Sequence, residues 1–174
     1  MSSKPSVWTE PSSGLTWHDE AFCSLAPKEL TEINASPMDP HGASWFRSPL
    51  DEYYDLIYRF DGAPGGAQPL SLFNLRRWLG SQPKGRMLRV QYWNGRLEVA
   101  ALDGTRIKSH CVYRTETPED AAYFILLSLE QLDWSGASTP VFWEGSDDSA
   151  VRRLTQHFIA HWHLRSLEGI LTPH

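Results

Sequence analysis

The sequence predicts an α/β (α+β) protein whose second half is a three-stranded antiparallel meander followed by a helix, a strand and a second helix. Two dipeptides, Asn94-Gly95 and Asp103-Gly104, separate runs of alternating apolar residues. Such dipeptides favour the positive φ angles of two-residue hairpin turns. After the third run, Thr117 and Pro118 give the start signal of a long apolar helix. Strands in this order, followed by helices, indicate helices packed on a sheet.

Residues 87–93, 96–102 and 105–115 supply the three strands of the meander. In the first run Leu88, Val90 and Tyr92 occupy alternate positions, so we expect them to share one face of the sheet. Glu98 interrupts the apolar pattern of the second run, and its simplest interpretation is a residue on a solvent face.

The first helix carries a clear amino-terminal signal. We expect Thr117 to cap it, Pro118 to occupy its first turn, and Glu119 and Asp120 to lie at the positive end of its dipole. The residues that follow are apolar nearly all round. The helix should therefore be covered on more than one side, with Phe124 fully buried.

Residues 140–145 predict a short buried strand. A second helix should begin at Asp147 or Asp148 and include residues 149–162, and residues 163–171 read as a final extended stretch.

The first half reads as an irregular, partly helical and aromatic-rich segment. Turn formers cluster at residues 36–44 and 61–69. Ser48, Pro49 and the acids after them predict a helix over residues 48–60. A second helix is expected over residues 71–80, and a short strand with a helical turn over residues 22–33. We expect residues 1–174 to form a single domain in which residues 1–86 cover a core of residues 87–170.

Composition and charge narrow the class of protein. The chain has 174 residues, 41% hydrophobic and 21% charged, with a net charge of −5. This balance offers no electrostatic footprint for nucleic acid, and no apolar run is long enough for a membrane helix. Its two cysteines, Cys23 and Cys111, argue against a disulfide framework, so a cytoplasmic location is expected.

The element order is that of a ribonuclease-H-like core, which is also one half of the actin-like ATPase fold. Residues 87–167 resemble a Bacteroidota family of unknown function with an actin-like ATPase fold. The resemblance rests on the hairpin at residues 94–104, on the helix and on the strand that follows it. The matching residues are Thr117, Pro118, Asp120, Tyr123, Leu127, Glu130, Gln131, Leu132 and Gly145.

The residues that phosphate chemistry needs are missing from the expected places. Actin-like ATPases hold phosphates at the turn between the first two strands, with an acid before it and hydroxyl groups in it. Residues 92–96 contain no acid and no Ser or Thr. Gly145, Ser146 and Asp147 are the remaining weak candidates for an atypical nucleotide site. The first strand also lacks the acid of a two-metal nuclease. We therefore predict no catalytic residues and no cofactor.

Two histidines suggest a metal site only weakly. His157 and His161 lie four residues apart, a spacing that lets two imidazoles share a metal on a helix. A third ligand could be His163, His110 or Cys111. Two unconnected histidines on a helix face are the favoured interpretation, so we predict no metal.

Aromatic residues of the first half offer a better lead. Tyr54 and Tyr58 should share a helix face, and Trp78 lies on the next helix, so these three are candidates for interaction. The predicted function is a non-catalytic protein-interaction or structural and assembly role, with a protein partner or self-association. The alternatives are a nucleotide-binding protein with an atypical site and a small histidine-based metalloprotein.

Overall fold

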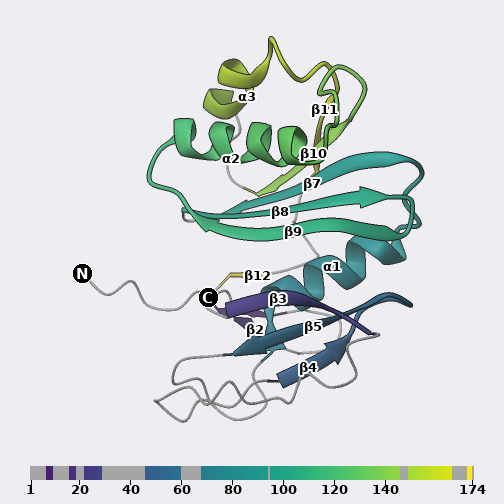
Figure 1. Ribbon diagram of the computed structural model, residues 1–174. Coiled ribbons are helices and arrows are strands. Elements are labelled where there is room, and N and C mark those ends of the chain that lie inside the picture. Colours follow the sequence, from purple (N-terminus) through teal and green to yellow (C-terminus); the bar gives the residue numbers. More distant parts are fainter. Residues whose placement is uncertain are drawn as a thin grey trace. The chain divides into compact units, whose positions relative to one another are not determined.

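The computed structural model describes residues 7–9, 16–18, 22–28, 46–59, 68–93, 95–145, 149–165 and 172–173 (Figure 1). The chain forms two compact units. Residues 78–167 make up the first, called here the core unit, and residues 1–77 with 168–174 make up the N-terminal unit. The division falls within helix α1 (Leu70–Gly80). That all 174 residues fold as one domain stays a prediction.

The core unit contains a five-stranded sheet with the strand order β11-β10-β7-β8-β9. β7, β8 and β9 form an antiparallel meander, and β10 pairs in parallel with both β7 and β11. This is the predicted order of elements. The strands are β7 (Arg86–Trp93), β8 (Arg96–Asp103), β9 (Arg106–Arg114), β10 (Val141–Gly145) and β11 (Trp162–Arg165).

Both predicted hairpin turns are confirmed. Gly95 has a φ of 73° and Gly104 a φ of 58°. Glycine adopts this left-handed conformation without the steric cost that a Cβ would bring. Trp93 is the register partner of Arg96, which leaves two residues for the first turn.

Helix α2 (Pro118–Gln131) begins where the sequence predicts. The Thr117 hydroxyl accepts a hydrogen bond from the Asp120 N–H at 3.1 Å, and the Asp120 carboxylate accepts one from the Thr117 N–H at 3.0 Å. This capping box satisfies N–H groups that the first helical turn leaves without partners. Hydrogen bonds from the N–H groups of Glu116 and Thr117 also lower the pKa of Asp120.

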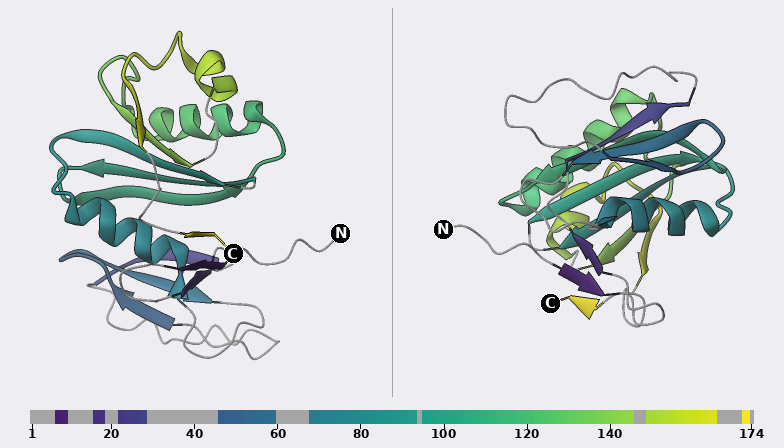
Figure 2. Two further views of the ribbon diagram at one scale, coloured as in Figure 1. Left: turned by 180° about the vertical axis from the view of Figure 1, so that it is seen from behind. Right: turned by 90° about the horizontal axis from the view of Figure 1, so that it is seen from below.

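One face of the sheet, called here the apolar face, is covered by α2 and by α3 (Ser149–Thr155) (Figures 1 and 2). The predicted alternation is confirmed, because Leu88 and Val90 lie in this core and Tyr92 packs against it. The core consists of Leu88, Val90, Leu97, Val99, Ala101, Ala121, Ala122, Ile125, Leu129, Trp134, Val141, Trp143, Val151 and Ile159.

The burial of α2 differs from residue to residue. Ile125 is fully buried, Phe124 is half-buried and Tyr123 is 60% exposed. Full burial of Phe124 is therefore a wrong prediction. The ring of Tyr113 stacks on Phe124 at a centroid distance of 3.9 Å and covers part of it. An apolar sequence on all sides of a helix does not require cover on all sides.

The second helix of the core unit is shorter than predicted, since it ends at Thr155 and does not continue to Trp162. The Thr155 carbonyl accepts hydrogen bonds from the N–H groups of Phe158 and Ile159, both at 2.9 Å. The chain turns here and brings Ile159, which is 5% exposed, into the apolar core.

The described part of the N-terminal unit is richer in strands than the sequence predicts. β3 (Phe22–Pro27), β5 (Tyr54–Arg59) and β4 (Phe46–Pro49) form an antiparallel sheet in that order. β12 (Thr172–Pro173), β1 (Val7–Thr9), β2 (Thr16–His18) and β6 (Gln68–Pro69) form another. The short strand predicted at the start of residues 22–33 is confirmed as β3. The strands of the second sheet have two or three residues each, too few alternating positions to be recognised from periodicity.

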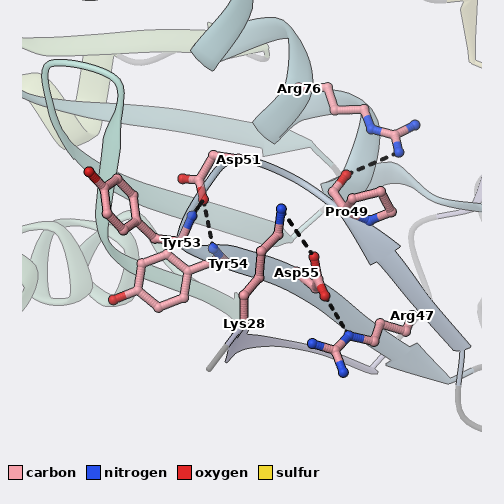
Figure 3. A network of polar contacts seen from close by, with 8 residues as sticks. All are labelled: Lys28, Arg47, Pro49, Asp51, Tyr53, Tyr54, Asp55 and Arg76. Atoms are coloured by element: carbon pink, nitrogen blue, oxygen red, sulfur yellow. Dashed lines mark hydrogen bonds and ion pairs between the residues drawn. The ribbon is translucent and has the colours of Figure 1, made fainter. Parts of the chain in front are cut away.

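The helix predicted for residues 48–60 is wrong, because a hairpin occupies this segment. The Asp51 carboxylate accepts hydrogen bonds from the N–H groups of Tyr53 at 2.8 Å and Tyr54 at 2.7 Å (Figure 3). An Asp side chain that binds its own backbone favours a turn over a helix. Proline followed by acids thus marked the hairpin loop here, and the aromatic and branched residues after it suit a strand.

Polar contacts hold this hairpin in the N-terminal unit (Figure 3). Asp55, which is 8% exposed, lies beside Arg47 and 3.9 Å from the Lys28 ammonium. Arg76 of α1 donates a hydrogen bond to the Pro49 carbonyl at 3.2 Å. The helix predicted for residues 71–80 is confirmed as α1.

Some predicted features lie outside the described residues: the loop at 36–44, residues 61–67 of the loop predicted at 61–69, and the helical turn after residue 28. The last two residues of that second loop form strand β6. No helix in the described parts of the chain is long and apolar enough to cross a membrane.

Candidate functional site

The face of the core-unit sheet opposite α2 carries a cluster of polar side chains beside apolar ones such as Ala100 and Leu102. Alternate strand positions place these side chains on it, because neighbours of the residues in the apolar core point the other way. Gln91 of β7 lies directly opposite Glu98 of β8 and also opposite Glu144 of β10. The polar face, as the term is used here, consists of Arg89, Gln91, Arg96, Glu98, His110 and Glu144.

This polar face is buried. Glu98 is 0% exposed, Gln91 and Glu144 are 1% exposed, and Arg96 is 3% exposed. The interpretation of Glu98 as a solvent-facing residue is therefore wrong. Alternation in a strand shows which side chains share a face, but it does not show whether water covers that face. Buried charges need partners, because removing them from water is costly.

Glu98 has two such partners within hydrogen-bond distance. An Arg96 nitrogen lies 2.8 Å from one carboxylate oxygen, and His110 Nε2 lies 2.9 Å from the other. Burial alone would raise the pKa of Glu98, but the Arg96 guanidinium and His110 outweigh it and hold this pKa well below its usual range. The carboxylate is thus kept charged inside the protein.

The carboxylate of Glu98 also orients His110. With Nε2 donating to Glu98, a neutral ring carries its lone pair on Nδ1. Nδ1 is buried and has no hydrogen-bond partner among the described residues. A carboxylate behind a histidine is common in metal sites. Across the described ranges, however, no group of three His, Cys, Asp or Glu side chains is placed to hold a metal ion.

Glu144 is held by a second set of partners. The indole N–H of Trp78 donates to one carboxylate oxygen at 3.1 Å, and an Arg89 nitrogen lies 3.9 Å from the other. Arg89 also donates to the Ser81 hydroxyl at 3.2 Å. Both acids of the polar face are therefore bound to donors of the chain itself.

The carboxyl ends of β7 and β10 meet at one edge of the sheet, where an actin-like ATPase would hold phosphate. Residues 92, 93, 95 and 96 bring no carboxylate and no Ser or Thr hydroxyl to this edge. Arg96 points into the polar face, where it pairs with Glu98. The described residues of this edge therefore do not fit a Mg²⁺-bound phosphate.

Gly145 has a packing role at the same edge. It is the register partner of Tyr92 and has a φ of 124°. A Cβ on Gly145 would lie 2.0 Å from the Tyr92 carbonyl oxygen. Close contact between the two backbones thus accounts for a residue without a side chain at this position. Ser146 and Asp147 lie outside the described residues.

The two histidines proposed as weak metal ligands do not share a helix. His157 lies in the turn that follows α3, and His161 lies in the segment before β11. The spacing of four residues therefore does not place them on one helical face. The Gly136 carbonyl accepts the Ala160 N–H at 3.1 Å, which fixes the turn against the loop after α2.

The three residues proposed for interaction have different surroundings. Tyr54 and Tyr58 do share a face, that of strand β5, because a spacing of four residues suits a strand as well as a helix. Tyr54 is half-buried and Tyr58 is 7% exposed. Trp78 is 1% exposed and belongs to the core unit through Glu144. A role of these residues in interaction stays a prediction.

The sheet order and the two helices on one face define the class of fold. It is the ribonuclease-H-like fold, from which each lobe of the actin-like ATPases is built. A solved structure confirms the resemblance: a Bacteroides thetaiotaomicron protein with actin-like ATPase fold and unknown function is similar with a TM-score of 0.69 and 12% identity. The likeness covers 82% of this chain, so it extends well beyond residues 87–167.

This chain spans 64% of the length of the Bacteroides protein. The PilM–PilN type IV pilus biogenesis complex is similar with a TM-score of 0.49 and 12% identity, over 86% of this chain and 67% of that one. A TM-score below 0.5 does not define a shared fold, so only the first likeness bears on the fold. No family model and no curated protein matches the sequence.

Sequence reasoning missed the network of Glu98, Arg96 and His110. A usable signal was present, because Arg96 and Glu98 lie two residues apart in a run that is otherwise apolar. Opposite charges at alternate positions of a central strand share one face and can neutralise each other.

Proposed function

We propose that this protein acts through protein contacts, in a structural or assembly role, on an actin-like fold that does not carry phosphate chemistry. One observation supports this above all others: both carboxylates of the polar face are paired with donors of the chain itself.

The argument concerns the source of positive charge. In a site for Mg²⁺ and phosphate, carboxylates bind the ion directly or through water. Here Arg96 neutralises Glu98 and His110 forms a hydrogen bond with it, while Trp78 and Arg89 bind Glu144. An ion would have to displace a buried guanidinium from its carboxylate partner Glu98, which is strongly unfavourable.

Composition supports the class of partner. With a net charge of −5 the chain as a whole lacks the positive charge that binding to phosphate backbones favours, so we infer a protein partner or a second copy and not nucleic acid. Neither of the two cysteines forms a disulfide bond, which suits a reducing compartment such as the cytoplasm.

Calorimetry with ATP and Mg²⁺ tests the proposal. We expect no heat of binding, no shift of the melting temperature and no hydrolysis above buffer, since a ligand that binds the folded state must stabilise it. A dissociation constant in the millimolar range or tighter would contradict the proposal and favour an atypical nucleotide site near Gly145.

The aromatic residues of β5 provide a second test. Tyr54→Asp places a charge on the half-buried member of the predicted interaction set. If this face meets a partner or a second copy, the variant should keep its melting temperature and lose association in light scattering. A monomeric wild type whose variant unfolds would remove this face from the proposed contact surface.

A further inference from the structure

We propose that β11 is a docking edge at which an extended segment of a partner protein, with alternating acidic and apolar residues, adds a further strand to the sheet. This inference rests on the proposed function, because it names the kind of contact that the chain makes.

The position of β11 in the sheet is the first observation. β11 is the outermost strand next to β10, and no described strand pairs with it on its other side. The Val141 N–H donates to the His161 carbonyl at 2.8 Å, so the backbone groups of His161 point towards β10. Backbone groups alternate along a strand, so those of His163 also point to β10, and those of Leu164 point outward. An outward N–H and C=O can pair with an added strand.

The side chains of β11 divide into an apolar and a basic side. Trp162 stacks on Trp143 of the apolar core at 5.8 Å, and Leu164, on the same side, is 57% exposed. On the other side His163 stacks on the Phe142 ring at 4.7 Å, and the Arg165 guanidinium lies 5.4 Å from the centre of that ring. An added strand would present alternate residues to these two sides.

The charged residues of the segment that ends in β11 all have one sign. Residues 149–165 contain no Asp or Glu, although the whole chain has more acidic than basic residues. Glu144 is the register partner of Arg165, but it is buried and bound by Trp78. At the strand itself His161, His163 and Arg165 are exposed.

These features indicate which kind of strand can bind at the edge of β11. A second copy that paired through its own β11 would bring basic residues against basic residues, which is unfavourable. A partner strand with acidic residues beside His163 and Arg165, and apolar residues beside Leu164, satisfies both sides. The geometry therefore points to an acidic, alternating segment of another protein.

Fluorescence anisotropy with two labelled synthetic peptides tests this proposal. One peptide alternates valine and glutamate, and the other has the same composition with all valines before all glutamates. We expect the alternating peptide to bind at least about tenfold more tightly to the wild-type chain, a difference of about 1.4 kcal/mol. Its affinity should fall with added salt, because opposite charges are screened.

Two pairs of variants locate the binding edge. Leu164→Pro removes only an outward N–H, a position where an edge strand tolerates proline, so it should fold and lose the alternating peptide. The control is Leu164→Ala, which keeps the backbone N–H and should retain backbone pairing. A proline at Leu154 cannot serve as the control, because it would break helix α3. Arg165→Gln should weaken binding, while Arg153→Gln, the same change of charge on α3, should leave it unchanged.

Several outcomes would overturn the proposal. Equal affinity for the two peptides would do so, as would undiminished binding by a folded Leu164→Pro. A wild-type dimer that Leu164→Pro converts to a monomer would show that a second copy occupies the edge instead. None of these outcomes changes the result with ATP and Mg²⁺, so failure of the docking edge can be told apart from failure of the proposed function.

Discussion

The two faces of the core-unit sheet are both buried, but they are stabilised by different physical interactions. On the apolar face, Leu88, Val90 and Ile125 remove hydrocarbon from water, and the gain grows with the area buried. On the polar face, the buried carboxylates of Glu98 and Glu144 are stabilised by hydrogen-bond donors of the chain itself. The apolar face should therefore respond to mutation in proportion to lost volume, and the polar face according to which partner is left unpaired.

The largest effect should come from breaking the polar face. Glu98→Ala leaves the buried Arg96 and His110 without their shared carboxylate. We expect a loss of about 3 to 5 kcal/mol in the free energy of unfolding, measured by urea denaturation, because a buried guanidinium loses its carboxylate partner. Glu130→Ala is the matched control, since Glu130 is exposed at the end of α2; its cost should stay within about 0.5 kcal/mol. Equal effects of the two variants would mean that Glu98 is hydrated.

The apolar face should lose somewhat less from a single truncation. Ile125 is fully buried in the core beneath α2. Ile125→Ala should cost about 2 to 5 kcal/mol in the same denaturation experiment, from lost hydrophobic transfer and from the cavity that remains. Ile125→Val removes one methylene and should cost about 0.5 to 1.5 kcal/mol. A graded series of this kind is expected only on the apolar face, where no charge is left unpaired.

The sequence predicted the apolar face far better than the polar one. Leu88 and Val90 were placed correctly because alternation and the two glycine turns determine the register of a meander locally. Glu98 was misplaced because its burial depends on what covers the far side of the sheet, which a local pattern does not record. The hairpin at residues 46–59 was missed for a related reason, since Ser48 and Pro49 suit a turn as well as a helix start. Gly145 was found, but its contact with Tyr92 depends on the pairing of distant strands.

Lowering the pH should reduce the contribution of the polar face to the free energy of unfolding and leave that of the apolar face unchanged. Because the pKa of Glu98 is lowered in the folded state, its contribution to stability is complete above its ordinary pKa of 4.5 and is lost as the pH falls towards the folded value. Glu98→Gln should cost about 1.5 to 3 kcal/mol at pH 7, as a hydrogen bond to a charged group is replaced by a neutral one. Melting curves of both proteins from pH 7 to pH 3 should converge as the pH falls. A difference that stays constant with pH would show that Glu98 titrates alike in the folded and unfolded chains.

The smallest effect should appear at the margin of the apolar face, where Phe124 is half-buried beside the fully buried Ile125. Its ring stacks on Tyr113 at 3.9 Å, with an angle of 10° between the planes. Phe124→Ala should cost about 1 to 2 kcal/mol, from partial loss of buried area and of one aromatic contact.

A second measurement, the pKa of Tyr113, distinguishes this site from a core position. The pKa of Tyr113 is raised to about 12, mainly by burial and to a smaller extent by Cys111. Removing the stacked ring exposes the phenol, so alkaline absorbance titration should show one tyrosine moving towards its ordinary pKa of 10.0.

Tyr123→Ala is the control for the stability measurement, since that side chain is 60% exposed and its loss should leave the unfolding free energy nearly unchanged. An equal cost for Phe124→Ala and Ile125→Ala would mean that Phe124 is as well covered as Ile125. The half-burial of Phe124 described here would then be wrong.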